Sequence, residues 1–474
     1  MSTGLLQNQH GITGPAAKVD DNPDVQGDES IDRATSLRPS KIVSTYLLIS
    51  GLYTLSASVI WGVNTLFLLD AGLDIFEVFV VNTAFTAGMV LFEIPTGVVA
   101  DTGGRRLSFL WSAVILLIGT LGYVWIAAMG GGLLPFLAAS IVLGLGFCLY
   151  SGAVEAWLVD ALKATGYEGQ LDPVFARGSM VSGAAMLAGS VGGGLLGNTD
   201  LAWPFLARAA MLAAVFAVGF ATMHDVGFSP QTTRVSAMPT EMKRVFRASL
   251  NYGWRHRSVR ALMVVSLIQG GFLMWGWYAW QPHFLDLLGR DAVWVAGVIS
   301  AALALSTIAG NGVVEFFTRF CGKRTTLLLT AALAMAAATV GVGLAGSFWP
   351  AVAFLLVAMA AMGVAEPVHQ AYLHGVVPSE ERATVVSFDS LVASAGGIGG
   401  QLGLGYISRA ASIATGYVTG GVALLVALPV LILLRRLGER TDVIVGRRAG
   451  AHSPCAAQGL PEVASIDTTA RQAV

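Results

Sequence analysis

Charged side chains are scarce in this sequence. Only 12% of its 474 residues are Asp, Glu, Lys or Arg, whereas 55% are hydrophobic. A soluble domain carries about 25% charged residues, and the mean hydropathy of +0.68 is too high for a water-exposed surface. The formal net charge of −1 gives no electrostatic basis for binding nucleic acid. Composition therefore excludes an ordinary soluble domain and indicates a membrane protein.

Cysteine is also nearly absent. Cys148, Cys321 and Cys455 have neither metal-ligand spacing nor an extracellular disulfide pattern, so we expect no metal site and no cofactor. The nucleotide-binding loop Gly-x-x-x-x-Gly-Lys-[Ser/Thr] is missing too. ATP is therefore not the expected energy source.

Long apolar stretches recur instead, separated by short polar or Gly-rich breaks. Each reaches the roughly 20 residues needed to cross about 30 Å of hydrocarbon. Lipid offers the backbone no hydrogen-bond partners, so such segments must be helices. The sequence predicts an all-α integral membrane protein with twelve transmembrane helices, near 42–70, 75–100, 106–128, 133–160, 178–198, 203–223, 259–287, 292–317, 324–346, 349–376, 383–408 and 412–435.

Basic residues orient these spans. If both termini are cytoplasmic, all of the 28 Lys and Arg residues lie inside except Arg208, Arg290 and Arg409. This bias predicts a multi-pass protein of the plasma membrane with both ends in the cytoplasm. The expected domains are a disordered tail over 1–41, a six-helix bundle over 42–223, a cytoplasmic central loop over 224–258, a second six-helix bundle over 259–437 and a disordered tail over 438–474.

The two predicted bundles repeat each other. Trp61 and Asp70 correspond to Trp277 and Asp286, and several other matches recur at a nearly constant spacing. A regular spacing of weak matches indicates duplication, so we expect pseudo-symmetric halves.

A short motif lies between the second and third predicted spans. Residues 97–106 read Gly-Val-Val-Ala-Asp-Thr-Gly-Gly-Arg-Arg, in which glycines permit a tight turn and Asp101 can pair with Arg105. The stretch resembles the signature loop Gly-x-x-x-Asp-x-x-Gly-Arg-Arg of the major facilitator superfamily. The resemblance implies two six-helix bundles and a conformational latch between them; the alternative is a purely structural turn. The latch residues are Gly97, Asp101, Gly104, Arg105, Arg106 and Asp160.

The second half carries an altered copy of this loop. Glu315 stands in place of the first glycine and Arg319 in place of the acid. We therefore expect no symmetric second latch.

Other segments resemble bacterial drug-efflux members of the superfamily, namely 92–97, 151–157 and 382–388. The run 189–197 is similar to the antiporter motif Gly-x-x-x-Gly-Pro-x-x-Gly-Gly, with Gly194 in place of the proline. The resemblance implies an efflux antiporter. Close-packing glycines serve any transporter, however, and the arginine that many drug–proton antiporters carry in span four is absent.

Ionisable residues inside the predicted spans need a reason, because burying a charge there costs about 2.5–3.5 kcal/mol. Glu366 and His369 share a face of span ten and could form a proton-coupling pair; the alternatives are hydrogen-bonded packing or a gate at Pro367. Glu93 and Glu155 lie near the cytoplasmic end and also fit a latch or gate. The candidates for proton coupling are Glu366, His369, Glu155, Asp389 and Glu93.

Aromatic and amide residues in spans one and seven suggest a substrate cavity. Such a lining suits an amphipathic ligand, a cationic one included. The stretch 275–280 also fits the aromatic belt at the outer interface. The cavity candidates are Trp61, Asn64, Gln269, Trp277 and Gln281.

These features predict a secondary active transporter rather than an enzyme. It would work by alternating access and couple efflux of a hydrophobic or amphipathic small molecule to proton antiport. Its partners would be this substrate, protons and the lipid bilayer, with no oligomer required. The alternatives are uptake or facilitated diffusion of a nutrient or ion on the same fold, or a transporter-like membrane receptor.

Overall fold

The computed structural model describes residues 38–228, 255–289, 292–378 and 381–444, and within these ranges the chain is almost wholly helical. The elements are α2 (Pro39–Ser58), α3 (Asn64–Asp70), α4 (Ile75–Gly103), α5 (Arg105–Ala128), α6 (Leu133–Tyr150), α7 (Ala153–Ala164), α8 (Asp172–Gly197), α9 (Trp203–Thr222), α11 (Arg257–Leu288), α12 (Val293–Thr318), α13 (Arg324–Leu344), α14 (Phe348–Val376), α15 (Arg382–Ala410), α16 (Ile413–Leu424), α17 (Ala427–Leu437) and a 3-10 turn, η2 (Arg440–Asp442). The predicted tails and central loop lie largely outside these ranges, as does Cys455.

Ten helical segments of the described residues are long and apolar enough to cross a membrane. The predicted spans 42–70 and 383–408 do not meet this criterion. The first is divided at residues 59–63 into α2 of 20 residues and α3 of 7 residues, and the second is a continuous helix rich in Gly and Ser. The count of twelve spans in two six-helix bundles stays a prediction.

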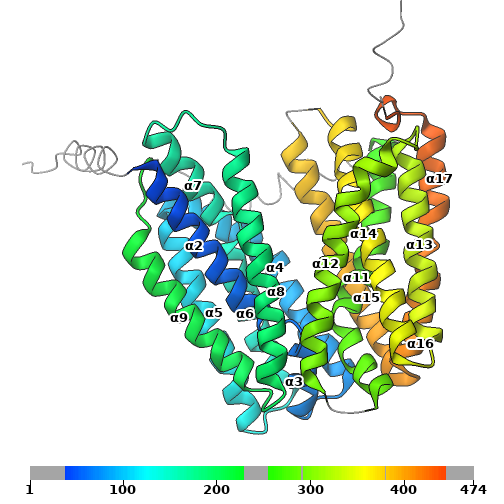
Figure 1. Cartoon of the computed structure of the whole chain (residues 1–474), viewed down its shortest axis with the longest axis horizontal. Coiled ribbons are helices and arrows are strands. Elements are labelled where there is room, and N and C mark those ends of the chain that lie inside the picture. Colours follow the sequence, from blue (N-terminus) through cyan, green and yellow to red (C-terminus); the bar gives the residue numbers. More distant parts are fainter. Residues whose placement is uncertain (1–37, 229–254, 290–291, 379–380, 445–474) are drawn as a thin grey trace, which may run out of the picture.

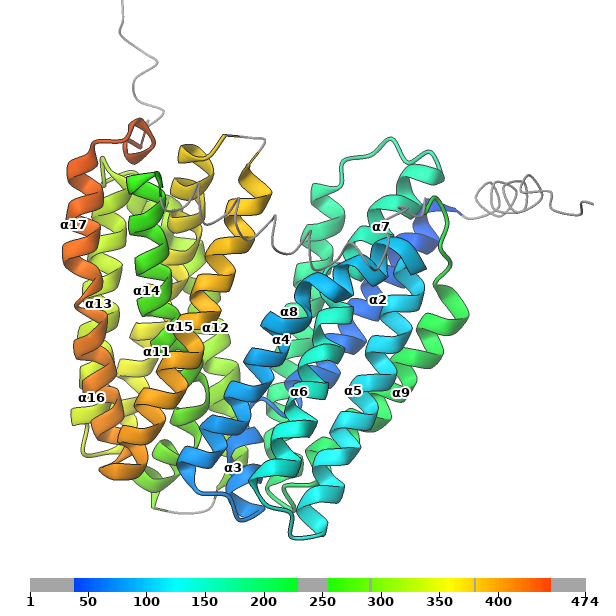
Figure 2. The ribbon, with the colours of Figure 1, turned by 180° about the vertical axis from the view of Figure 1, so that it is seen from behind.

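The helices gather in two groups. Helices α2 to α9 lie on one side and α11 to α17 on the other, and we call these the N-terminal and C-terminal groups (Figure 1). Seen from behind, the groups approach each other near α3 and diverge at the opposite end (Figure 2). We call the end near α3, where the groups approach each other, the converging end. We call the opposite end the charged end, because the turns at residues 101–106 and 319–324 lie at that end.

Polar contacts join the two groups at the converging end. The Gln281 amide accepts from the backbone N–H of Thr65 at 3.0 Å and donates to the Trp61 carbonyl at 2.8 Å. The Thr83 hydroxyl donates to the Gln401 amide oxygen at 3.2 Å. These side chains are buried, so they close the space between the groups on this side.

Close backbone packing closes the same region. A Cβ placed on Gly297 of α12 would lie 2.5 Å from the Ser190 carbonyl oxygen and 2.8 Å from Gly194 Cα of α8. Only glycines allow two helices to approach this closely. Residues 189–197, which resemble an antiporter motif, therefore lie where the two groups pack together.

Candidate functional site

A central cavity of about 380 Å³ lies between the two groups. This volume suits a small molecule, and its walls come from both groups, as the predicted alternating access would require. The lining residues are Tyr53, Ala57, Ile60, Trp61, Asn64, Asn82, Phe85, Thr86, Met89, Leu116, Tyr123, Leu143, Phe147, Arg208, Leu273, Met274, Trp277, Tyr278, Met362 and Ser394.

Three of the five predicted cavity residues line this space. Trp61 and Trp277 meet edge to face with ring centroids 5.8 Å apart, and the Asn64 amide donates to Asn82 at 3.1 Å. Gln281 does not line the cavity; it is fully buried in the contact that closes the converging end. Gln269 lines a neighbouring cavity instead.

The alternative interpretation of residues 275–280, an aromatic belt at the outer interface, is wrong for Trp275 and Trp280. Trp275 is 0% exposed and Trp280 is 3% exposed. Trp275 packs on Tyr417 with ring centroids 4.9 Å apart. These side chains belong to the packed interior of the C-terminal group, where they cannot reach a lipid interface.

Arg208 is a cavity residue that the sequence reading missed, because the charge count placed it outside the membrane. The structure puts it within α9, lining the central cavity. Its Nε is buried and has no hydrogen-bond partner among the described residues. The available signal was a lone basic residue inside the apolar stretch 203–223.

A smaller cavity of about 140 Å³ adjoins the central one and shares Leu273 and Met362 with it. His369 Nε2 lies 3.1 Å from Asp389 Oδ2. The Ser266 hydroxyl donates to Asp389 Oδ1 at 2.8 Å and lies 3.3 Å from the His369 ring nitrogen. These three buried groups, from α11, α14 and α15, form what we call the Asp389 cluster.

The expected pairing of Glu366 with His369 is not formed. Glu366 also lines the smaller cavity, but its carboxylate accepts from the Gln370 side chain at 3.1 Å and is exposed. His369 instead bonds to residues on other helices, because the side chains of α11 and α15 pack against its face of α14. Two carboxyl groups and one imidazole thus border the same space.

The other two acid candidates lie nearer the charged end. Glu93 lies in the half of α4 that leads to the charged end, and Glu155 lies in the first turn of α7. Both side chains are exposed, and neither has an ion pair among the described residues. The structure thus places them apart from the Asp389 cluster.

Three of the six predicted latch residues come together at the charged end, and all three lie within the N-terminal group. Arg105 lies 2.6 Å from Asp101 and 3.9 Å from Asp160 of α7. All three side chains are partly exposed, so each pair contributes only modest stability. A Cβ placed on Gly97 would meet nothing within 4 Å, so close packing in this conformation does not require that glycine.

The same turn is held by Asp225, which the sequence reading missed. Asp225 accepts from the Arg106 backbone N–H at 2.8 Å and so caps α5. Burial raises the pKa of the Asp225 carboxyl despite the hydrogen bond and charge of Arg106. Gly104 has a φ of 104°, and a Cβ there would lie 2.4 Å from the Asp225 carboxylate. Glycine is therefore required at this position.

The C-terminal group repeats the cap but not the latch. Asp442 accepts from the Thr325 backbone N–H at 2.8 Å and so caps α13. In place of the acid–arginine cluster, Arg319 pairs at 2.9 Å with Glu315 of its own helix, and both side chains are exposed. This agrees with the departures of the second loop copy from the motif.

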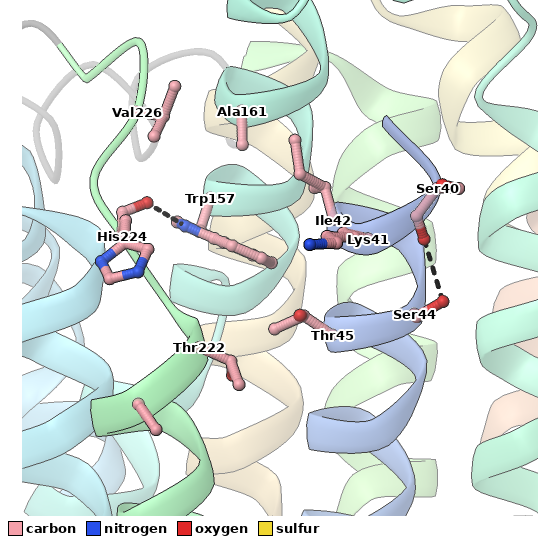
Figure 3. A pocket seen from close by; sticks show the side chains of 11 residues that line it. Ser40, Lys41, Ile42, Ser44, Thr45, Trp157, Ala161, Thr222, His224 and Val226 are labelled. Carbon is pink, nitrogen blue, oxygen red and sulfur yellow. Dashed lines mark hydrogen bonds between the residues drawn. The ribbon is translucent and has the colours of Figure 1, made fainter. Parts of the chain in front are cut away.

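A third cavity, of about 430 Å³, lies on the N-terminal group alone, between α2, α7 and the chain after α9 (Figure 3). Trp157 donates there to the His224 carbonyl at 2.7 Å. No residue of the C-terminal group lines it, so rocking of the two groups would not expose it alternately to the two sides of a membrane. It is the poorer candidate for a transport site.

Metal-ligating residues do not gather anywhere in the described ranges: no three His, Cys, Asp or Glu side chains are placed to hold an ion together. Cys148 and Cys321 are free thiols.

Comparison with known proteins bears on the fold and the class. A profile of the Major Facilitator Superfamily matches residues 46–319 and 295–465. An uncharacterized MFS-type transporter of Bacillus subtilis (strain 168), YxaM, is 22% identical over 409 residues, which span 84% of this chain and 97% of that protein.

Solved structures of transporters are similar in fold. The nucleoside transporter NupG has a TM-score of 0.68 and 13% identity, over 83% of this chain and 99% of that one. A bacterial homolog of the human lysosomal transporter Spinster, inward-facing and unoccupied, has a TM-score of 0.62 and 16% identity, over 85% and 97%. A POT family transporter in complex with 5-aminolevulinic acid has a TM-score of 0.65 and 13% identity, over 84% and 96%.

Proposed function

Because the chain belongs to the major facilitator superfamily and is a membrane transporter rather than an enzyme, we propose that it is a proton-coupled secondary transporter that exports an amphipathic small molecule. The observation that carries this proposal is the central cavity, whose walls come from both groups and whose lining is mainly aromatic and apolar. A transporter that alternates between two facing states needs its site at such a boundary.

We infer that the Asp389 cluster carries the coupling proton, with Glu366 as the second candidate. A carboxyl beside an imidazole and a hydroxyl can gain or lose a proton without leaving either form unpaired. The cluster adjoins the substrate cavity through shared lining residues, so protonation there can alter substrate binding. Glu93 and Glu155, which are exposed near the charged end, fit a gate better than a buried proton site.

The proposed function also implies a membrane topology. Twelve spans in two six-helix bundles would include α2 with α3, and α15, as crossing helices. The charged end would face the cytoplasm of a plasma-membrane protein, because the basic residues gather there. The contacts at the converging end would then be those of an inward-facing state. The Asp101–Arg105–Asp160 cluster is already formed in this state and lies within the N-terminal group, so we propose that it latches the outward-facing state only when the C-terminal group contacts it.

Export rather than uptake rests on the sequence resemblance to drug-efflux members, so uptake or facilitated diffusion on this fold is the second candidate. A receptor role is weaker because a receptor has no need for intramembrane proton sites. The test is a transport screen in an efflux-deficient host, followed by flux of the identified compound in proteoliposomes. Accumulation driven by an imposed pH gradient, with counter-movement of protons, supports export; co-movement indicates symport, and saturable binding without counterflow indicates a receptor.

A further inference from the structure

Arg208 is the only charged residue among those that line the central cavity. It lies in α9, one of the helices long and apolar enough to span a membrane. A basic side chain within a membrane-spanning helix costs free energy, and it persists where a partner or a function offsets that cost. The described chain supplies no such partner: no carboxylate lies within ion-pair distance, and Nε is buried without an acceptor.

The acids of the adjoining cavity are already engaged. The Asp389 carboxylate bonds to Ser266 and His369, and the Glu366 carboxylate bonds to Gln370. The electrostatic neighbours of Arg208 are instead the tyrosines Tyr53, Tyr123 and Tyr278. A tyrosine hydroxyl can donate or accept a hydrogen bond, whereas a guanidinium only donates. The lining around Arg208 thus carries no negative charge and can supply donors to an anion.

We propose that Arg208 binds an oxyanion, a carboxylate or phosphate, on the transported molecule. The inference rests on the proposed transport function and specifies its substrate class, an amphipathic anion. Arginine pairs with carboxylates and phosphates through two parallel hydrogen bonds. The apolar body of the substrate would lie against the Trp61 and Trp277 rings, which border the same cavity. This replaces the expectation that the cavity could take a cation, which Arg208 would repel.

The test measures binding to the purified full-length protein in nanodiscs of phosphatidylcholine. Three probes share one aromatic body and differ in charge: dansylglycine is an anion, its methyl ester is neutral and a dansyl trimethylammonium compound is a cation. We expect wild type to bind dansylglycine at least about tenfold more tightly than the ester, as for a hydrogen bond to a charged group. The cation should bind most weakly.

Substitutions assign this preference to Arg208. Arg208→Gln should remove the preference for dansylglycine, whereas Arg208→Lys, which keeps the charge, should retain part of it. The control is Arg319→Gln, which removes an equally basic residue whose exposed side chain is paired within α12; it should bind as wild type does. Arg208→Lys also separates loss of charge from loss of folding.

Failure of dansylglycine to bind, equal binding of anion and ester, or an unchanged preference in Arg208→Gln would each overturn the proposal. So would competition by phosphatidylglycerol added to the nanodisc, because the occupant would then be a lipid headgroup. The measurement uses no gradient and no flux. A protein that binds the anion through Arg208 but moves no proton-coupled substrate would contradict the transport proposal and leave this one standing.

Discussion

His369 Nε2 lies 3.1 Å from Asp389 Oδ2, and the two residues come from different helices, α14 and α15. Ser266 of α11 bonds to both, so three helices meet at one protonatable cluster. Any change in its protonation alters hydrogen bonds that join these helices. The proposed proton coupling would act through these hydrogen bonds on the shape of the C-terminal group.

Asp389→Asn should abolish pH-gradient-driven accumulation in proteoliposomes, because the amide cannot exchange a proton. Exchange of substrate without a gradient should survive, since exchange needs no net proton movement. Glu366→Gln, whose carboxylate bonds only to Gln370 among the described residues, is the comparison. If Glu366→Gln abolishes driven accumulation and Asp389→Asn leaves it intact, Glu366 is the coupling acid.

Asp101→Asn should slow transport about fivefold while leaving thermal stability near that of wild type. The substitution weakens the 2.6 Å pair with Arg105, and a change of about 1 kcal/mol in one conformational state shifts the populations by this factor. Flux in proteoliposomes and melting in detergent measure the two effects. Normal flux from well-folded Asp101→Asn protein would reduce the motif to a structural turn.

Gly297→Ala should impair closure of the converging end, because its Cβ would meet the α8 backbone at less than 3 Å. Gly312→Ala, on the same helix with nothing within 4 Å of the added methyl, is the matched control. In a cysteine-free background, the single cysteine of Thr65→Cys should react faster with a thiol reagent when Gly297→Ala is added. Equal labelling in both alanine variants would show that this contact does not hold the end closed.

Asp225→Ala should cost about 1 kcal/mol of stability through loss of the α5 cap, and Asp442→Ala should cost a similar amount at α13. Because the folded-state pKa of Asp225 is raised, its contribution is greatest at low pH. It declines as pH rises from about 4, the unfolded value, through the folded value. Melting temperatures between pH 4 and pH 7 should therefore show a shrinking deficit for Asp225→Ala, and no deficit for the exposed Asp70→Ala.

The predicted orientation can be tested at Ser236, which lies outside the described residues. In a cysteine-free background, Ser236→Cys should resist a membrane-impermeant thiol reagent in intact cells and label after permeabilisation. The expectation follows from the distribution of basic residues. Rapid labelling in intact cells would place the segment 224–258 outside and reverse the topology.

Sequence reasoning succeeded where the signal is local. Helices follow from apolar length, and the Asp101–Arg105 contact follows from the nearness of these residues on either side of the turn at Gly104. It failed where partners come from distant segments. Nothing near His369 points to Asp389 rather than Glu366, and nothing in the loop at residues 97–106 points to Asp225. Arg208 was missed for another reason: a count of basic residues assumes that each lies at a membrane surface.

The helix caps made by Asp225 and Asp442 bear on the order in which the two groups fold. Asp225 follows α9 and caps a helix 119 positions back, and Asp442 follows α17 and caps a helix 117 positions back. Chains emerge from the ribosome N-terminus first, and domains fold as units in that order. Each cap is thus made by the last part of its own group to be synthesised. The N-terminal group can seal its charged end before any of the C-terminal group has entered the bilayer.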